Sequence, residues 1–163
     1  MTRLRDLLTV LVLLAFAAPL GAQTASVAFG AIQQDTGLPV EVTADNLAVD
    51  NATGTAVFSG NVVIVQGEMR LAAQEVLVVY RGTAEGIARL EAKGGVTLVS
   101  GPDAAESQTA DYDIDAGTIV MNGDVLLTQG QSALSADKMT VQLDDGTAQM
   151  AGRVKTILQT GDR

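Results

Sequence analysis

An alternation of apolar and polar residues with a period of two restricts the fold of this chain more than any other feature. It recurs in four related segments, which share a small or acidic start, two alternating stretches and a Gly followed two residues later by Val. The segments are residues 44–67, 73–101, 110–130 and 136–161. Such alternation is typical of β-strands that have one buried face. The repeat therefore predicts an all-β fold of many short antiparallel strands.

One glycine of each segment has the same parity as the apolar residues. These glycines are Gly60, Gly94, Gly123 and Gly152. A glycine whose missing side chain points into the core lets a strand bend sharply. Separate turn signals lie at 51–54, 81–86, 115–117 and 144–146, so the four glycines are not needed as hairpin turns. We expect them to be corners at which a sheet folds over on itself.

The apolar parity of the strands defines a candidate inner surface. Because the chain has no Cys, no Trp and only 3% aromatic residues, this surface consists mainly of aliphatic side chains. From spacing alone, core packing is the better interpretation of such residues. The candidates are Leu47, Val49, Phe58, Val62, Ile64, Val78, Leu98, Tyr112, Ile114, Met121, Val125, Met139 and Val141.

The first 22 residues are typical of a cleavable signal peptide. Arg3 and Arg5 precede an apolar run from Leu7 to Ala18, and small residues follow. The run is too short for a comfortable membrane span, although an uncleaved anchor helix stays open as the alternative. We expect a signal peptide at 1–22, a flexible segment at 23–38, one β-domain at 39–159 and a short tail at 160–163. The exported chain would then begin near Gln23.

Charge and composition argue against several functions. The chain carries 10 basic and 19 acidic residues, a net charge of −9, and loss of the leader would leave 8 and 18. Nucleic acid would repel such a protein, so no nucleic-acid partner is expected. The chain has no His and no Cys, and it lacks a nucleophile elbow or a phosphate-cradling loop. We therefore expect no enzymatic activity, cofactor or metal.

The stretch ADYDIDAG at 110–117 is the strongest candidate for a calcium site. An EF-hand loop needs Gly at its sixth position and Glu at its twelfth. Counted from Asp111, those positions hold Ala116 and Asn122. The alternation instead predicts that Asp111 and Asp113 face solvent, and that Asp115 begins a turn.

Residues 39–81 (PVEVTADNLAVDNATGTAVFSGNVVIVQGEMRLAAQEVLVVYR) resemble the OstA-like (LptA) family of periplasmic lipopolysaccharide-transport proteins. The likeness extends through MNGDVLLTQG and SADKMTVQL to about residue 158. It implies an open, V-shaped β-jellyroll in the periplasm that binds the lipid A acyl chains of lipopolysaccharide in an apolar groove. The inner-face candidates would line that groove, which we expect to stay partly open.

The resemblance also implies partners. Members of the family bridge an inner-membrane LptC-like component and an outer-membrane LptD-like component by pairing of edge strands, and copies can assemble head to tail. The expected edges here are strands at about 40–44 and 154–159, which carry Val40, Val42, Val154 and Leu158. Two alternatives stay open: a membrane-anchored LptC-like component of the same pathway, and a structural β-repeat surface protein.

Overall fold

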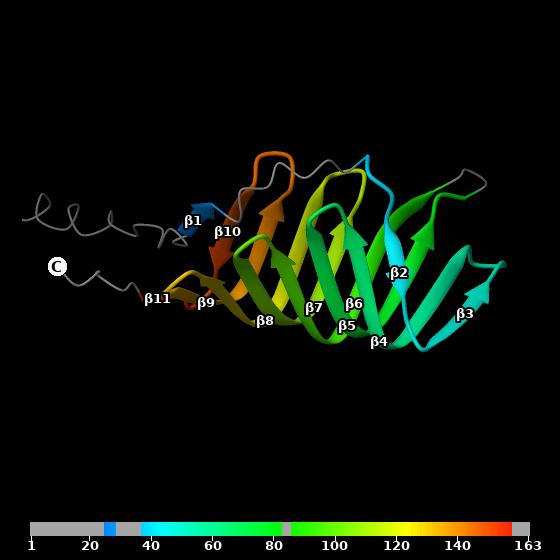
Figure 1. Cartoon of the computed structure of the whole chain (residues 1–163), viewed down its shortest axis with the longest axis horizontal. Helices are drawn as coiled ribbons and strands as arrows, with labels where there is room; N and C mark the ends of the chain where they lie inside the picture. Colours follow the sequence, from blue (N-terminus) through cyan, green and yellow to red (C-terminus); the bar gives the residue numbers. More distant parts are fainter. Residues whose placement is uncertain (1–24, 29–36, 83–85, 158–163) are drawn as a thin grey trace, which may run out of the picture.

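The computed structural model describes residues 25–28, 37–82 and 86–157, and these residues form one antiparallel sheet (Figure 1). All of its regular elements are strands, so the all-β prediction is confirmed. The strands are β1 (Ala25–Ala28), β2 (Glu41–Thr43), β3 (Asn46–Asp50), β4 (Thr55–Gln66), β5 (Met69–Tyr80), β6 (Ile87–Ser100), β7 (Asp103–Asp113), β8 (Thr118–Gln129), β9 (Ser132–Gln142), β10 (Thr147–Ala151) and β11 (Lys155–Ile157).

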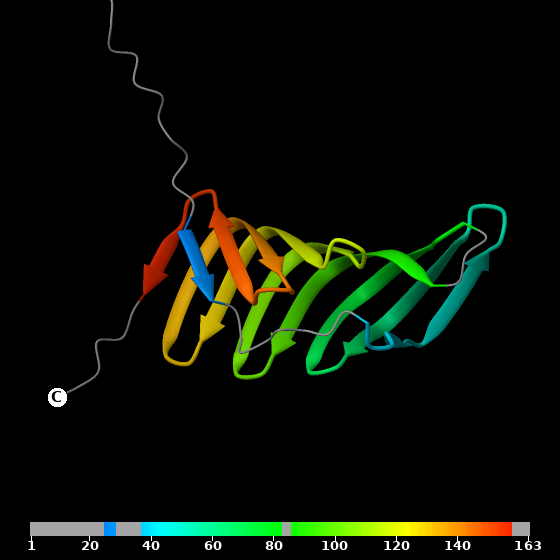
Figure 2. The ribbon, with the colours of Figure 1, turned by 90° about the horizontal axis from the view of Figure 1, so that it is seen from above.

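From β4 to β10, strands that are consecutive in the chain pair with each other. Strands β2 and β3 both pair with β4, whereas β11 pairs with β9 and β1 pairs with β10. Seen from above, β1 and β11 lie at one end of the molecule and β3 at the other (Figure 2). The sheet therefore stays open, because its two ends do not pair with each other.

Each long strand bends midway, so that the sheet folds into a V. The bends lie along the lower edge of the sheet in Figure 1. The strand pairing shifts register at these places, for example between Ser59 and Val62 of β4. Two consecutive residues with positive φ lie at the bends of β4, β6 and β8, and a fourth such pair lies between β10 and β11. The four pairs, called the corner pairs below, are Gly60–Asn61, Gly94–Gly95, Gly123–Asp124 and Gly152–Arg153. The predicted corners are thus present as β-bulges.

The corner glycines differ from the prediction in the direction of the missing side chain. A Cβ on Gly60 would meet Oδ2 of the exposed Asp45 at 2.6 Å, and one on Gly152 would meet Oδ2 of Asp137 at 2.5 Å. The bulge rotates the backbone at the corner, so this position faces polar side chains of a neighbouring segment and not the core. Glycine is required because the adjacent strand approaches so closely.

The bends divide the sheet into two leaves. The first leaf contains β1, β3, β10 and the halves of β4 to β9 that pair with them, at 55–59, 75–80, 87–93, 109–113, 118–122 and 138–142. The second leaf contains β2, β11 and the remaining halves, at 62–66, 69–73, 96–100, 103–107, 125–129 and 132–136. The edge opposite the corners, where the long strands end in turns, is called the mouth below.

The residues that face inward from both leaves form a single hydrophobic cluster. Val76, Val78, Leu98, Met121 and Met139 are each 0% exposed. Aliphatic side chains in alternation can fill the space between two facing sheets, which pack about 10 Å apart. Burial of this cluster is the main stabilising contribution that the sequence offers.

Four residues that precede the expected β-domain form a strand of the sheet. The segment at 23–38 is expected to be flexible, yet Ala25–Ala28 form β1, paired with Thr147–Met150 of β10. The first expected domain boundary, at residue 39, therefore separates β1 from a sheet to which it belongs. The predicted signal peptide at 1–22 and the tail at 160–163 lie outside the described residues.

Candidate functional site

The inner face of the V is the candidate binding site. Of the thirteen predicted lining residues, the nine buried ones are Val62, Ile64, Val78, Leu98, Tyr112, Met121, Val125, Met139 and Val141. Phe58 and Ile114 are partly buried and pack against the same cluster. The structure thus brings these eleven residues together between the leaves. The groove is expected to stay partly open, whereas here the two leaves cover each other's inner faces.

Leu47 and Val49 behave differently from the other lining candidates. They are opposite Phe58 and Ala56 in the β3–β4 register and so belong to the inner face, but they are 55% and 60% exposed. Strand β3 ends the first leaf, where β2 pairs with a different part of β4 and does not cover it. The apolar inner face therefore continues uncovered to this end of the sheet.

The mouth contains a cavity of about 400 Å³. Its apolar lining comes from Leu38, Val40, Ile87 and Ile114, with Gln66 among the polar lining residues. The side chain of Gln66 is buried and its Nε2 donates a hydrogen bond of 2.9 Å to the backbone carbonyl of Leu38. This cavity is a recess that reaches from solvent toward the buried inner face.

Tyr112 is the large polar side chain of the inner face. Its hydroxyl donates a hydrogen bond of 2.7 Å to Oε1 of Gln66, and its ring is 1% exposed. Burial raises the pKa of Tyr112 to about 12, and the negative charge of Asp144 acts in the same direction. The phenol is therefore neutral at any physiological pH, and it can act there as a donor.

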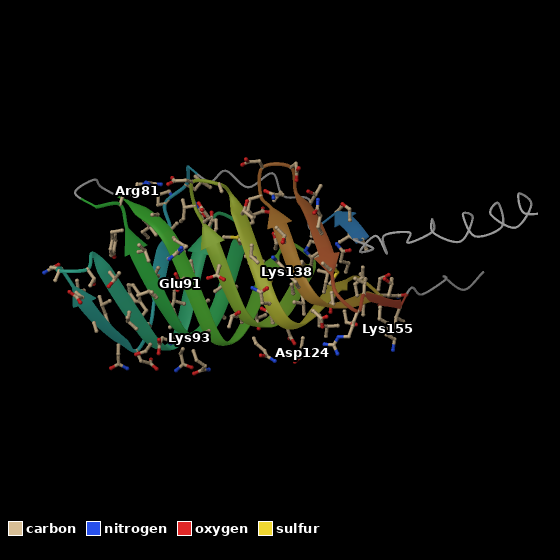
Figure 3. The ribbon with its side chains drawn as sticks, turned by 180° about the vertical axis from the view of Figure 1, so that it is seen from behind. Arg81, Glu91, Lys93, Asp124, Lys138 and Lys155 are labelled. Atoms are coloured by element: carbon tan, nitrogen blue, oxygen red, sulfur yellow. The ribbon has the colours of Figure 1, made fainter. Side chains whose placement is uncertain are left out.

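Most charged residues lie on the outer surface, whereas Asp103 is buried at the mouth. Figure 3 shows Arg81 at the edge of the mouth and Asp124 at the opposite edge, by the corners. Arg81 forms an ion pair with Asp115, and Nζ of Lys93 lies 2.8 Å from Oε1 of Glu75. The hydrogen bond to Glu75 raises the pKa of Lys93. These partly exposed pairs contribute little to stability.

The corner pairs carry further polar contacts on the outside of the V. Nδ2 of Asn61 donates to Oδ2 of Asp45 at 2.8 Å, and Nε2 of Gln108 donates to Oδ2 of Asp124 at 2.7 Å. Arg153 donates through Nε to Oδ1 of Asp137 at 2.9 Å. The hydrogen bonds from Arg153 lower the pKa of Asp137. The second residue of a corner pair thus forms a hydrogen bond with a neighbouring segment at three of the four corners.

The aspartates of the ADYDIDAG stretch face solvent as predicted. Asp111 and Asp113 are exposed on either side of the buried Tyr112, and Oδ1 of Asp113 accepts a hydrogen bond from the backbone N–H of Ala116 in the turn. Within residues 25–28, 37–82 and 86–157, no three His, Cys, Asp or Glu side chains are grouped so that they could hold a metal ion. The same residues contain no helix long and apolar enough to cross a membrane.

The expected edge strands lie at the ends of the sheet, where β2 spans Glu41–Thr43 and β11 spans Lys155–Ile157 within the described residues. Val42 is in β2, and Val40 lies just before it. Val154 precedes β11, and both Val40 and Val154 pack partly buried against the core. Leu158 lies outside the described residues. Strand β1, which the sequence pattern did not predict, is the additional edge beside β10.

Two glutamines at the mouth are functional candidates that the sequence reasoning missed. Gln66 and Gln129 end β4 and β8 in the similar segments VIVQG and LLTQG. Each has the parity of the inward residues, since Gln66 follows Val62 and Ile64 by steps of two. A polar residue in an inward position next to a turn is the signal that could have identified both.

Comparisons with known proteins agree on one family. Residues 41–149 match the family described as LptA/(LptD N-terminal domain) LPS transport protein. An uncharacterized protein of Rhizobium meliloti (strain 1021) is 30% identical over 154 residues, which cover 87% of this chain and 82% of the relative. The lipopolysaccharide export system protein LptA of Escherichia coli (strain K12) is 24% identical, over 82% of this chain and 78% of its own.

A solved structure has the same fold. The crystal structure of LptH from Pseudomonas aeruginosa, described as the LptA-homologous periplasmic component of the lipopolysaccharide transport device, superposes with a TM-score of 0.69. The match covers 77% of this chain and 99% of LptH, at 18% sequence identity.

Proposed function

Because the chain belongs to the LptA/(LptD N-terminal domain) LPS transport protein family, we propose that it carries lipopolysaccharide across the periplasm, from an inner-membrane exporter to an outer-membrane translocon. The acyl chains of lipid A bind between the two leaves, and the headgroup stays outside. The single observation that carries this proposal is the continuous apolar inner face, which runs from Leu47 and Val49 through the buried cluster.

The energetics favour a passive carrier. Each methylene removed from water is stabilised by about 0.8 kcal/mol, so one acyl chain gains roughly 10 kcal/mol relative to exposure. A membrane hides the same chains equally well, and the groove therefore only has to match it approximately. A net flow of lipopolysaccharide must then be driven by an upstream motor, because binding in the groove supplies no driving force of its own.

The distribution of charge agrees with binding through the acyl chains. A protein that gripped the phosphates of lipopolysaccharide would need clustered Arg and Lys side chains. Here Arg81, Lys93 and Arg153 each form an ion pair with an acidic residue. Their charges are paired on the outer surface, which leaves the apolar inner face as the binding surface.

The two ends of the sheet fit a bridge. Strands β2 and β3 end the sheet on one side, and β1 and β11 end it on the other. Edge strands accept further strands through backbone hydrogen bonds. We assign these ends to an LptC-like component, to an LptD-like component and to head-to-tail contacts between copies of the chain. The exposed Leu47 and Val49 would let the apolar surface continue into the next subunit.

Photo-crosslinking in cells tests the proposal. A photoreactive residue at Leu47 or Phe58 should label lipopolysaccharide, because both side chains belong to the inner face. Ala48 is the matched control, since it is exposed on the same strand but on the opposite face, and Asp113 is a second outward control. Equal labelling from Leu47 and Ala48 would refute binding on the inner face.

A further inference from the structure

Two glutamines of the second leaf each form a hydrogen bond to a residue of the first leaf. Oε1 of Gln66 accepts the hydrogen bond from Tyr112, which is in the first-leaf part of β7. Nε2 of Gln129 donates to the backbone carbonyl of Ala28 in β1, and β1 pairs with β10 of the first leaf. Both glutamines are the last residues of their strands. Two of the contacts between the leaves at the mouth are therefore polar hydrogen bonds.

The glutamine side chains are also tied to other parts of the mouth. Nε2 of Gln66 donates to Leu38 next to the mouth cavity, and Nε2 of Gln129 donates to Oδ2 of Asp103 at 2.9 Å. Gln66 and Tyr112 are each 1% exposed. Because an amide and a phenol are costly to bury without partners, these contacts favour the closed arrangement of the leaves.

A closed mouth affects the entry of lipid, because the inner face is buried. An acyl chain cannot reach side chains such as Leu98 and Met121, which are 0% exposed, unless the leaves separate. We propose that Gln66 and Tyr112, supported by Gln129, form a latch that keeps the leaves together without lipid, and that acyl chains enter past the mouth cavity when this latch breaks. The nature of the ligand rests on the function proposed above, whereas the latch itself does not.

The position of the latch at the mouth makes it reversible. When the leaves separate there, water reaches the Tyr112 hydroxyl and the Gln66 amide and replaces the lost hydrogen bond. The net cost is then that of one ordinary hydrogen bond, which changes an opening equilibrium by about 2- to 10-fold. The same pair deep among the core side chains would be left unsatisfied by an entering acyl chain.

Electron spin resonance measures the latch without any lipid. The described residues contain no cysteine, and the sequence has none, so spin labels can be placed at Asp111→Cys in the first leaf and Thr128→Cys in the second. Both residues are exposed and lie on the neighbouring strands β7 and β8. We expect Tyr112→Phe to increase the population of longer distances by about 2- to 10-fold.

The matched control removes a similar hydrogen bond within one leaf. Oγ1 of Thr118 donates to Oε1 of Gln142 at 2.9 Å, and both belong to the first leaf. Thr118→Val should leave the distance distribution unchanged. If Tyr112→Phe folds poorly, Gln129→Ala removes the hydrogen bonds to Ala28 and Asp103 and should shift the distances in the same direction.

Binding of fluorescently labelled lipopolysaccharide provides the second measurement. The association rate should rise by about the same 2- to 10-fold in Tyr112→Phe and stay unchanged in Thr118→Val. Equal distances and rates in both variants would refute the latch while the proposed function stands. If the wild-type protein binds no lipopolysaccharide, the proposed function fails, and the spin-label distances alone still decide whether the latch exists.

Discussion

Replacing Gly94 with Ala tests the idea that close strand approach at the corners sets the shape of the sheet. Gly94 has a φ of +84°, and an added Cβ would lie 2.7 Å from Cβ and 3.2 Å from Cγ of Gln74. Because the Cβ of Gln74 is attached directly to the backbone, rotation of its side chain cannot relieve the clash. One of the two strands must move.

The expected loss of stability is the sum of three effects. A non-glycine residue in the left-handed region costs about 1–2 kcal/mol, and forcing an extra methyl group into a filled space costs about 1–3 kcal/mol. The lower entropy of Ala in the unfolded chain returns about 0.4–1 kcal/mol. Gly94→Ala should therefore lower the free energy of unfolding by about 3 kcal/mol.

Gly95 is the matched control for this variant. It has nearly the same φ, +85°, but an added Cβ would meet no atom within 4 Å. The equivalent residues of the other corner pairs are Asn61, Asp124 and Arg153, all with positive φ, so a side chain fits here. Gly95→Ala should cost about 1 kcal/mol, because it combines the backbone strain with the same entropy gain but adds no clash.

Urea denaturation followed by circular dichroism measures both variants. The expected difference between them, about 2 kcal/mol, is the part due to the clash with Gln74. Equal losses for Gly94→Ala and Gly95→Ala would mean that only the backbone conformation requires glycine. The close approach of the neighbouring strand would then have no role at the corner.

The core, the corner ion pair and the buried phenol each give a separate prediction. Met139→Ala should lower the free energy of unfolding by about 2–5 kcal/mol, whereas Leu126→Ala, at a residue 40% exposed, should change it by less than about 0.5 kcal/mol in the same urea experiment. Because Arg153 lowers the pKa of Asp137, their pairing stabilises the fold at pH values above the ordinary Asp pKa of 3.8, and this stabilisation is lost as the pH falls through the lower folded pKa. The difference in unfolding free energy between wild type and Arg153→Ala at pH 7 should therefore disappear in strong acid. A difference that does not change with pH would contradict the pairing. Burial raises the pKa of Tyr112 from 10.0 to about 12. The neutral phenol therefore contributes fully to the free energy of unfolding below pH 10, and this contribution is lost between pH 10 and 12. Urea midpoints of unfolding measured across this range should fall more steeply in wild type than in Tyr112→Phe.

Local patterns predicted most of the fold. The alternation identified the long strands, and the glycine parity identified their bends, because both features act on residues that are neighbours in sequence. The outward positions of Asp111 and Asp113 followed from the same period of two. Strand β1 was missed because its four residues are too few for a pattern. Its partner β10 is about 120 residues away in the chain.

The inner face was predicted more fully than the mouth. Parity placed residues such as Val78 and Leu98 in the interior, where they are buried. It could not show that the leaves meet, because the angle at a corner depends on the bulge and on side chains such as Gln74 from another strand. The contact between Tyr112 and Gln66 joins residues 46 positions apart and depends on that angle. Exposure of Leu47 likewise follows from its place at the end of the sheet.

The regular pairing of the central strands has a consequence for length. In the described residues, each strand from β5 to β8 pairs only with its two neighbours in the chain. Duplication of one hairpin in the gene, such as β6–β7, would add two strands and lengthen the sheet by about 10 Å. Both terminal strands would keep their own partners and their own outer edges. The length of such a sheet can thus be adjusted one hairpin at a time.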